Sequence, residues 1–222
     1  AFENIATSTD NEEIAERSLL QAATQYEQAG NLIKAIVRYE KLRFKVPNST
    51  KVAEALYKAA TLSEKLPDYT RAAQNYIELV RVRPQSEYAS KALFNAAVAL
   101  ENANKPDQAM NVYARYAQSF NDDADRHLEA LLKVGEYAYK QGDYPKARQT
   151  FNQLHAAFQQ FKAQGKMVDE FLPAQAQFML AQIIFADYRK ISIGTNFKAD
   201  FARKQKLLNE VTLACRNTIN YK

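Results

Sequence analysis

The sequence predicts an all-α protein, a right-handed superhelical solenoid of antiparallel helix pairs with a C-terminal helical cap. Two observations predict this fold. The composition favours helices, since 47% of the 222 residues are hydrophobic and only 5 Gly and 6 Pro occur. A pattern of leucine, small residues and an aromatic also recurs every 37 or 38 residues. Short helix pairs bury their apolar faces by stacking on neighbouring pairs, so we expect about ten or eleven helices in one array.

The repeated pattern is the strongest signal in the chain. Its second helix carries an alanine and, four positions later, an aromatic residue, at Ala35 and Tyr39, Ala72 and Tyr76, Ala109 and Tyr113, and Ala147 and Phe151. Its first helix carries a leucine followed by a small pair: Leu19 with Ala22-Ala23, Leu56 with Ala59-Ala60, Leu93 with Ala96-Ala97, and Leu131 with Val134-Gly135. This agreement at four sites predicts four helical hairpins over residues 14–161.

The first hairpin follows a polar, acidic lead-in, residues 1–13, in which Thr7-Ser8-Thr9-Asp10 is the candidate N-cap cluster. We expect the first helix to run from Ile14 to Gly30, because glycine suits the left-handed turn after a helix. The second helix is expected to end at Pro47, since proline cannot continue a helix.

The second hairpin has the same plan and sets the register for the next two. Its two helices are separated at Leu66-Pro67-Asp68, and Pro84 ends the unit. The third and fourth hairpins repeat this register as far as Phe161.

Residues 162–222 depart from the register and are predicted to form an irregular helical extension with a capping helix. Gly165 lies in a breaker, and an unusually apolar helix starts near Leu172-Pro173. Its apolar residues predict a helix covered on two sides: Ala176, Phe178, Met179, Ile183, Ile184 and Phe185. A loop over 191–196 precedes the final helix. The final helix should cover its neighbour with one buried stripe, Phe197, Phe201, Leu208, Val211, Cys215 and Ile219.

At these positions the chain resembles the tetratricopeptide repeat (TPR) family, whose motif ends in Ala-x3-aromatic followed by Pro. Pro47 and Pro84 occupy the place of the closing proline, whereas Asn121 and Gln159 replace it in the third and fourth units. The resemblance covers roughly residues 16–161 and implies a protein–protein interaction scaffold. Repeats that end in Pro-Asn-Ser also resemble those of bacterial cell-envelope members. That likeness implies a larger envelope or secretion assembly in the periplasm, with the cytoplasm as the alternative.

Family members bind partners in a concave groove lined by the first helices, and the residue after the motif leucine points into it. The resemblance therefore implies a partner-binding strip at Leu20, Tyr57, Phe94 and Leu132, extended by Val98 and flanked by Glu54 and Lys91. The expected partner is an apolar or amphipathic segment, helical or extended, rather than a clamped C-terminal carboxylate. Tyr57 and Phe94 can instead pack between neighbouring hairpins, and the sequence leaves both roles open.

Charge is distributed unevenly along the chain. The net charge is +5, but residues 1–30 carry −5 and residues 189–222 carry +6. An alternative function is therefore binding of nucleic acid or another anionic surface through the basic final helix. The second helix is basic as well, at Lys34, Arg38, Lys41, Arg43 and Lys45, but it lacks interleaved exposed aromatics for base stacking.

The sequence offers no catalytic residues, cofactor site or metal-ligand set, and no enzyme or small-molecule substrate is predicted. Cys215 is the only cysteine, and neither His127 nor His155 has ligands at the spacing of a zinc site. Asp122-Asp123 and Asp125 lack the ligand run of a calcium loop and are expected at a helix N-terminus. No apolar run of about 18 residues predicts a transmembrane helix. The chain lacks an initiator methionine, which suggests a processed or excised segment; the partner and the oligomeric state stay open.

Overall fold

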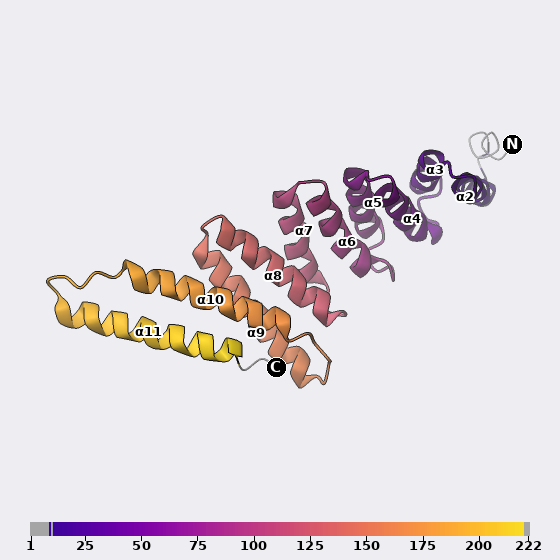
Figure 1. The fold of residues 1–222 in the computed structure, drawn as a ribbon. Coiled ribbons are helices and arrows are strands. Elements are labelled where there is room, and N and C mark those ends of the chain that lie inside the picture. The colour runs from indigo at the N-terminus through magenta and orange to yellow at the C-terminus, as the bar shows by residue number, and fades with distance from the viewer. Residues whose placement is uncertain (1–8, 10, 220–222) are drawn as a thin grey trace. The chain divides into compact units, whose positions relative to one another are not determined.

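The computed structural model describes Thr9 and residues 11–219 (Figure 1). Over these residues the chain forms ten α-helices and no strand, which confirms the predicted all-α fold. The helices are α2 (Glu12–Gln28), α3 (Leu32–Lys45), α4 (Lys51–Lys65), α5 (Tyr69–Val82), α6 (Ala89–Asn102), α7 (Pro106–Ser119), α8 (Ala124–Lys140), α9 (Tyr144–Ala163), α10 (Phe171–Lys190) and α11 (Phe197–Ile219). None of these described helices has the length and apolar character needed to cross a membrane.

The chain divides into two compact units, residues 1–112 and 113–222, with the boundary inside α7. In the first unit α2 packs on α3 and α4 on α5, while α3 also contacts α4 and α5 contacts α6. In the second unit α8 packs on α9 and α10 on α11, and α10 also contacts α8 and α9. Helix pairs that stack on the next pair are the arrangement predicted for a solenoid.

Side-chain caps begin several helices where the sequence predicted breaks. In each case an Asn or Asp oxygen accepts a hydrogen bond of 3.1–3.2 Å from the backbone N–H three residues further on, at Asn31, Asp68, Asp123 and Asp143. Gly30 has a φ of 73°, the left-handed conformation that glycine adopts without steric cost after a helix. These local signals set the hairpin breaks.

The first helix begins two residues earlier than predicted. α2 starts at Glu12, and its N-cap is Asn11, whose Oδ1 accepts a hydrogen bond of 3.1 Å from the Ile14 N–H. From the predicted cap cluster, Thr9 accepts a hydrogen bond from the Asn11 N–H at 3.2 Å, while Thr7, Ser8 and Asp10 lie outside the described residues. The cluster therefore precedes the cap.

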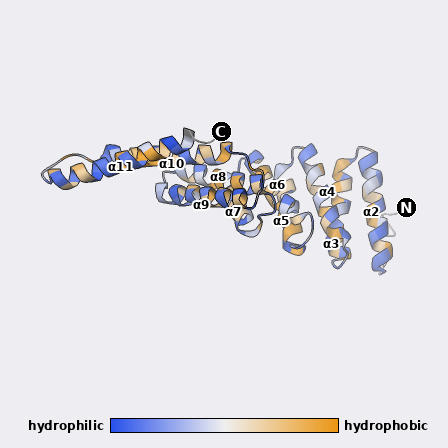
Figure 2. Cartoon of the chain, turned by 90° about the horizontal axis from the view of Figure 1, so that it is seen from below, coloured by the Kyte–Doolittle hydropathy of each residue, from blue (hydrophilic) through white to orange (hydrophobic). Residues whose placement is uncertain are grey.

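The repeated residues form the buried seam of the hairpins, as predicted. The four alanines, Ala35, Ala72, Ala109 and Ala147, are each 0% exposed, and the aromatics that follow them are at most 2% exposed. The four motif leucines are buried as well. Most helices carry both hydrophobic and hydrophilic residues (Figure 2), as expected of helices that bury one side and expose the other.

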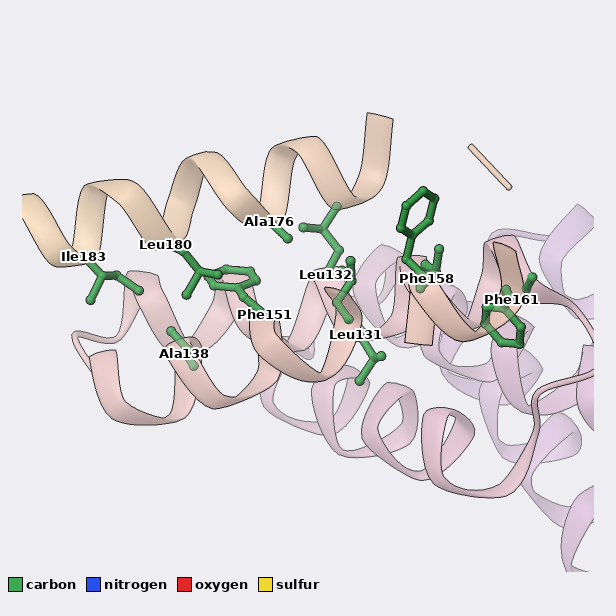
Figure 3. Close-up of a cluster of buried hydrophobic side chains, with 13 residues drawn as sticks. Leu131, Leu132, Ala138, Phe151, Phe158, Phe161, Ala176, Leu180 and Ile183 are labelled. Carbon is green, nitrogen blue, oxygen red and sulfur yellow. The ribbon is translucent and has the colours of Figure 1, made fainter. Parts of the chain in front are cut away.

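The core of the second unit depends on one close approach between helices. Ala176, Leu180 and Ile183 of α10 lie over a buried cluster that contains Phe151 (Figure 3). A Cβ atom built on Gly135 of α8 would lie only 2.5 Å from the Phe151 ring, which is 0% exposed. The small residue at position 135 thus allows the aromatic residue of the same repeat to lie against the α8 backbone.

The final helix packs through a different face from the one predicted. Phe197, Phe201 and Leu208 of the predicted buried stripe are 46–60% exposed, and Cys215 is exposed too. Val211, also of the predicted stripe, is partly buried. Beside it Ala214 is buried and Leu207 is partly buried, and neither was predicted. The side chain of Ile219, the last residue of the predicted stripe, is not among the side chains that the structure describes. The packed face therefore lies roughly a quarter of a turn from the predicted stripe.

The apolar helix α10 is likewise covered less completely than predicted. Ala176 and Ile183 are buried, and Met179 and Ile184 are partly buried. Phe178 and Phe185 are 52% and 46% exposed, so one side of α10 is left open in this structure.

A polar network links successive second helices in the first unit. The Arg71 guanidinium donates two hydrogen bonds to the Glu40 carboxylate, at 2.7 and 2.8 Å, and the Asn75 amide donates a third at 2.8 Å. Burial alone would raise the pKa of Glu40. The hydrogen bonds from Arg71 and Asn75, and the charges of Arg71 and Arg43, outweigh burial and hold this pKa below its ordinary value.

Glu40→Gln is expected to lower the free energy of unfolding by about 1–2 kcal/mol at neutral pH, because it removes the charge that accepts these hydrogen bonds. The pKa of Glu40 is lower in the folded state, so its contribution is fully present above the unfolded-state pKa. That contribution disappears as the pH falls through the folded-state pKa. Urea unfolding of both proteins over an acid pH series measures the difference, which should shrink on acidification.

Glu64→Gln is the control, because its effect on the free energy of unfolding should depend on pH in the opposite direction. Burial raises the pKa of Glu64, although the Tyr76 hydroxyl donates to its carboxylate at 3.2 Å. The folded state therefore disfavours the ionised form, and this penalty is lost as the pH falls. A pH-independent difference between wild type and Glu40→Gln would contradict the assigned role of Glu40.

Candidate partner-binding surface

The structure places the predicted partner-binding residues in two different environments. Leu20, Tyr57, Val98 and Glu54 are partly exposed, and Lys91 is exposed. Phe94 and Leu132 are only 7% and 5% exposed, so both are packing residues in this structure. A partner can contact the first group directly, but the prediction that Phe94 and Leu132 face an open groove is wrong.

Tyr57 lies in an aromatic cluster between the second and third hairpins. Its ring is 5.4 Å from the Tyr76 ring in an edge-on arrangement and 5.3 Å from the Tyr88 ring, measured between centroids. Its hydroxyl accepts a hydrogen bond of 3.3 Å from the Asn95 side chain. Tyr57 thus packs between hairpins, which is one of the two roles that the sequence left open, and its ring stays partly exposed.

Cations lie over this aromatic cluster and beside it. The Lys91 ammonium is 5.8 Å from the centre of the Tyr57 ring, within reach of a cation–π interaction. One turn before Tyr57, Glu54 forms ion pairs with Lys51 at 3.4 Å and Lys58 at 3.2 Å. Burial would raise the pKa of Glu54, but Lys58 and Lys51 outweigh it and lower this pKa, which keeps the carboxylate ionised.

Tyr88 and Asn95 belong to the cluster and were missed by the repeat register. Tyr88 is the residue just before α6, outside the motif positions, so periodicity gave no reason to select it. Asn95 directly follows Phe94, and its contact with a residue 38 positions away arises only from the stacking of two hairpins. We call Tyr57, Tyr88, Lys91 and Asn95 the Tyr57 surface.

In the second unit, the corresponding positions on α8 contact other residues of the same unit. Leu132 belongs to the buried cluster that includes Phe151 and Leu180. One turn further along α8, the Glu136 carboxylate accepts a hydrogen bond from the Gln175 side chain of α10. Within this unit, Leu132 and Glu136 are therefore engaged by intramolecular packing and hydrogen bonding.

The residues of the alternative, basic surface are partly engaged inside the protein. Arg43 pairs with Glu78 at 3.2 Å and stacks on Phe44, and the Lys34 ammonium lies 5.3 Å from the Tyr26 ring centre. On α11, Lys204 donates a hydrogen bond of 3.2 Å to the Ile191 carbonyl. These contacts remove several cations from an anion-binding array.

The polar residues weighed for metal binding have structural partners. Asp123 caps α8, and the His127 ring nitrogen lies 2.8 Å from the Phe120 carbonyl oxygen. In the described part of the chain, no group of three or more His, Cys, Asp or Glu is placed to hold a metal ion.

Comparison with known proteins gives a family match and similar folds. Residues 91–122 and 129–162 match the tetratricopeptide repeat family. A TPR repeats protein from Bacteroides fragilis NCTC 9343 is 12% identical, with 93% of this chain and 89% of that chain covered and a TM-score of 0.60. The apo form of RapI is 13% identical, with 90% of this chain and 55% of that chain covered and a TM-score of 0.50. No curated protein matches the sequence.

The family match and the structure agree on the repeat unit. The matched segments span α6 with α7 and α8 with α9. The two preceding hairpins carry the same buried alanine and aromatic, at Ala35 with Tyr39 and Ala72 with Tyr76. Identities this low support the fold and leave the binding partner open. The chain therefore carries tetratricopeptide repeats at residues 91–122 and 129–162 and has the stacked helical hairpins of a TPR solenoid.

Proposed function

We propose that this protein is an interaction scaffold that binds an apolar or amphipathic segment of a partner protein at the Tyr57 surface. The TPR fold supports a protein-interaction role in general. The observation that supports this particular surface is the partly exposed Tyr57 ring, held in place by two tyrosines and Asn95 and covered by Lys91. An aromatic side chain that is already ordered loses little conformational entropy on binding, which makes it an effective anchor.

Charge around the anchor would orient the bound segment. Lys91 is exposed above the Tyr57 ring, and Lys51 and Lys58 form ion pairs with Glu54, which lies one turn before Tyr57. A segment with an apolar residue against Tyr57 and a carboxylate near Lys91 suits this arrangement. We expect the charges to affect orientation and association rate more than affinity.

Tyr57→Ala is expected to weaken binding by about 2 kcal/mol, or roughly 30-fold in Kd. Peptides selected from a phage-displayed library against the wild-type protein serve as ligands, and fluorescence anisotropy measures their Kd. Tyr57→Phe is the matched control, because it keeps the ring and removes only the hydroxyl that accepts from Asn95. Circular dichroism checks that helical content is unchanged in each variant.

Two further variants separate this surface from the basic one. Lys91→Ala should weaken binding several-fold, whereas Lys204→Glu with Lys206→Glu on α11 should leave it within about twofold. Phe94→Ala is unsuitable as a binding variant, since Phe94 is buried and its loss would destabilise the fold. A large effect of the α11 pair together with a silent Tyr57→Ala would refute the Tyr57 surface and favour the alternative, anionic-surface binding.

The cellular setting is proposed from the sequence alone. We propose a bacterial periplasmic or cell-envelope location, within a larger envelope or secretion assembly, because the first repeat ends in Pro-Asn-Ser as in envelope members of the family. Fractionation of the native source with antibody detection tests this location. Recovery in the cytoplasmic fraction would contradict it.

A further inference from the structure

The hairpin of α10 and α11 has an exposed aromatic face on its outer side. Six large apolar side chains on these two helices are 46–60% exposed. Leu213 lines a cleft on the α9 side, and the other five are Phe178, Phe185, Phe197, Phe201 and Leu208. Phe197 and Phe201 stack on each other, with ring centroids 5.9 Å apart. Solvent-exposed apolar residues gathered in one place mark interaction surfaces more often than single ones do. We call these five residues the outer aromatic face.

Helical geometry places all five residues on the side of the hairpin away from α9. A cleft on the α9 side is lined by Arg148 and His155 of α9, Gln177 and Ile184 of α10, and Glu210, Leu213 and Asn217 of α11. Phe178 directly follows Gln177, and Phe185 directly follows Ile184, so each phenylalanine lies about 100° further around α10 than the cleft residue before it. On α11, the stripe that packs on α10 separates two sides of the helix. Phe201 and Leu208 lie on one side of this stripe, and Glu210 and Leu213 lie on the other, which is the α9 side.

Cations border this face, and the acids of the hairpin lie elsewhere. Around the helix axes, three exposed cations lie next to the exposed aromatics: Arg189, Lys198 and Arg216. None of the three forms an ion pair with another described residue. Residues 171–219 contain three acids: Asp187, Asp200 and Glu210. All three line a separate cleft with Arg203 and Lys206, in which Asp187 also pairs with Arg148 at 2.9 Å. The outer aromatic face is therefore apolar and positively bordered.

The spacing of the exposed residues suits a helix as the bound element. Phe178 and Phe185 are seven positions apart, as are Phe201 and Leu208. Seven residues are two helical turns, the period at which side-by-side helices meet. A second copy of this chain would bring an identical positive border to the face, and like charges would oppose that pairing.

We infer that the outer aromatic face binds an acidic amphipathic helix of a partner protein, which packs along α10 and α11 as a further layer. Its apolar side would cover the exposed phenylalanines, and its carboxylates would lie near Arg189, Lys198 and Arg216. This contact is separate from the Tyr57 surface and does not depend on it.

Two synthetic helical peptides of about three heptads test the inference. Both carry leucine at the apolar heptad positions, and one has glutamate and the other lysine at the remaining positions. Fluorescence anisotropy with the intact chain should show that the glutamate peptide binds at least tenfold more tightly than the lysine peptide. The preference should fall as salt is raised, because exposed charges are screened.

Variants locate the binding site. Phe201→Glu with Leu208→Glu should reduce binding of the glutamate peptide at least tenfold, and both side chains are exposed, so the fold should survive. Arg189→Glu with Lys198→Glu should reduce it several-fold. Arg203→Glu with Lys206→Glu is the matched control, with the same charge change on the other side of the hairpin, and should have at most a twofold effect. Tyr57→Ala should leave this binding unchanged.

Several outcomes would overturn the inference. Equal affinity for the two peptides would show unspecific apolar contact, and absence of binding would leave the face without this occupant. Sedimentation that shows a dimer abolished by Phe201→Glu with Leu208→Glu would assign the face to a second copy instead. Tighter binding of a single-stranded oligonucleotide, lost in Arg189→Glu with Lys198→Glu, would assign it to nucleic acid.

Discussion

Ala72→Glu is expected to unfold the second hairpin together with the hairpins that stack on it in the first unit. Ala72 is 0% exposed and lies on α5, which packs on α4, so a glutamate side chain at this position would have to be buried. An unpaired buried charge costs several kcal/mol, comparable with the whole stability of a domain, about 5–15 kcal/mol. Because repeats are stabilised by their neighbours, the loss should spread beyond one hairpin.

Gln74→Glu is the control for this prediction. It introduces the same charge on the same helix, two residues away, at an exposed position, and should change stability by less than about 0.5 kcal/mol. Thermal unfolding followed by circular dichroism, together with limited proteolysis, compares the two variants. Wild-type resistance to proteolysis in Ala72→Glu would mean that Ala72 is not part of the seam.

Gly135→Val is expected to destabilise the second unit by about 3 kcal/mol. Even a Cβ at position 135 would lie 2.5 Å from the Phe151 ring, and the ring is enclosed by the buried cluster of α8, α9 and α10. The added methyl groups therefore require displacement of the ring or of the helix. Urea unfolding measures the change, and Gly194→Ala in the loop before α11, where a Cβ would meet no atom closer than 3.7 Å, should have little effect.

A double-mutant cycle with Phe151→Ala tests whether this contact is the cause. Phe151→Ala alone removes a fully buried ring and should cost about 3–5 kcal/mol. In the double variant the valine methyl groups can occupy part of the space that the ring leaves, so the loss should be smaller than the sum of the two single losses by more than 1 kcal/mol. Strictly additive losses would contradict direct packing of position 135 on Phe151.

The partner-binding strip shows how far repeat register can predict a surface. The register selected Leu20, Tyr57, Phe94 and Leu132 as equivalent residues, and they do occupy equivalent places in their repeats. Their exposure differs because it depends on what each neighbour covers: Phe94 and Leu132 are buried, whereas Tyr57 stays partly open between Tyr88 and Lys91. Contacts between residues almost 40 positions apart, such as Asn95 with Tyr57, leave no periodic signal.

The sequence by itself determined the hairpins and their seam. Small residues at Ala35, Ala72 and Ala147, aromatics four positions later, and polar caps such as Asp68 act within one hairpin or at its break, so their pattern is readable along the chain. Only the tertiary structure decided which part of a broad apolar face is covered. On α11 the apolar residues span more than one stripe, and packing on α10 covers Ala214 while Phe201 and Leu208 stay exposed. Periodicity gives the side of a helix that is apolar, but burial depends on how neighbouring helices approach it.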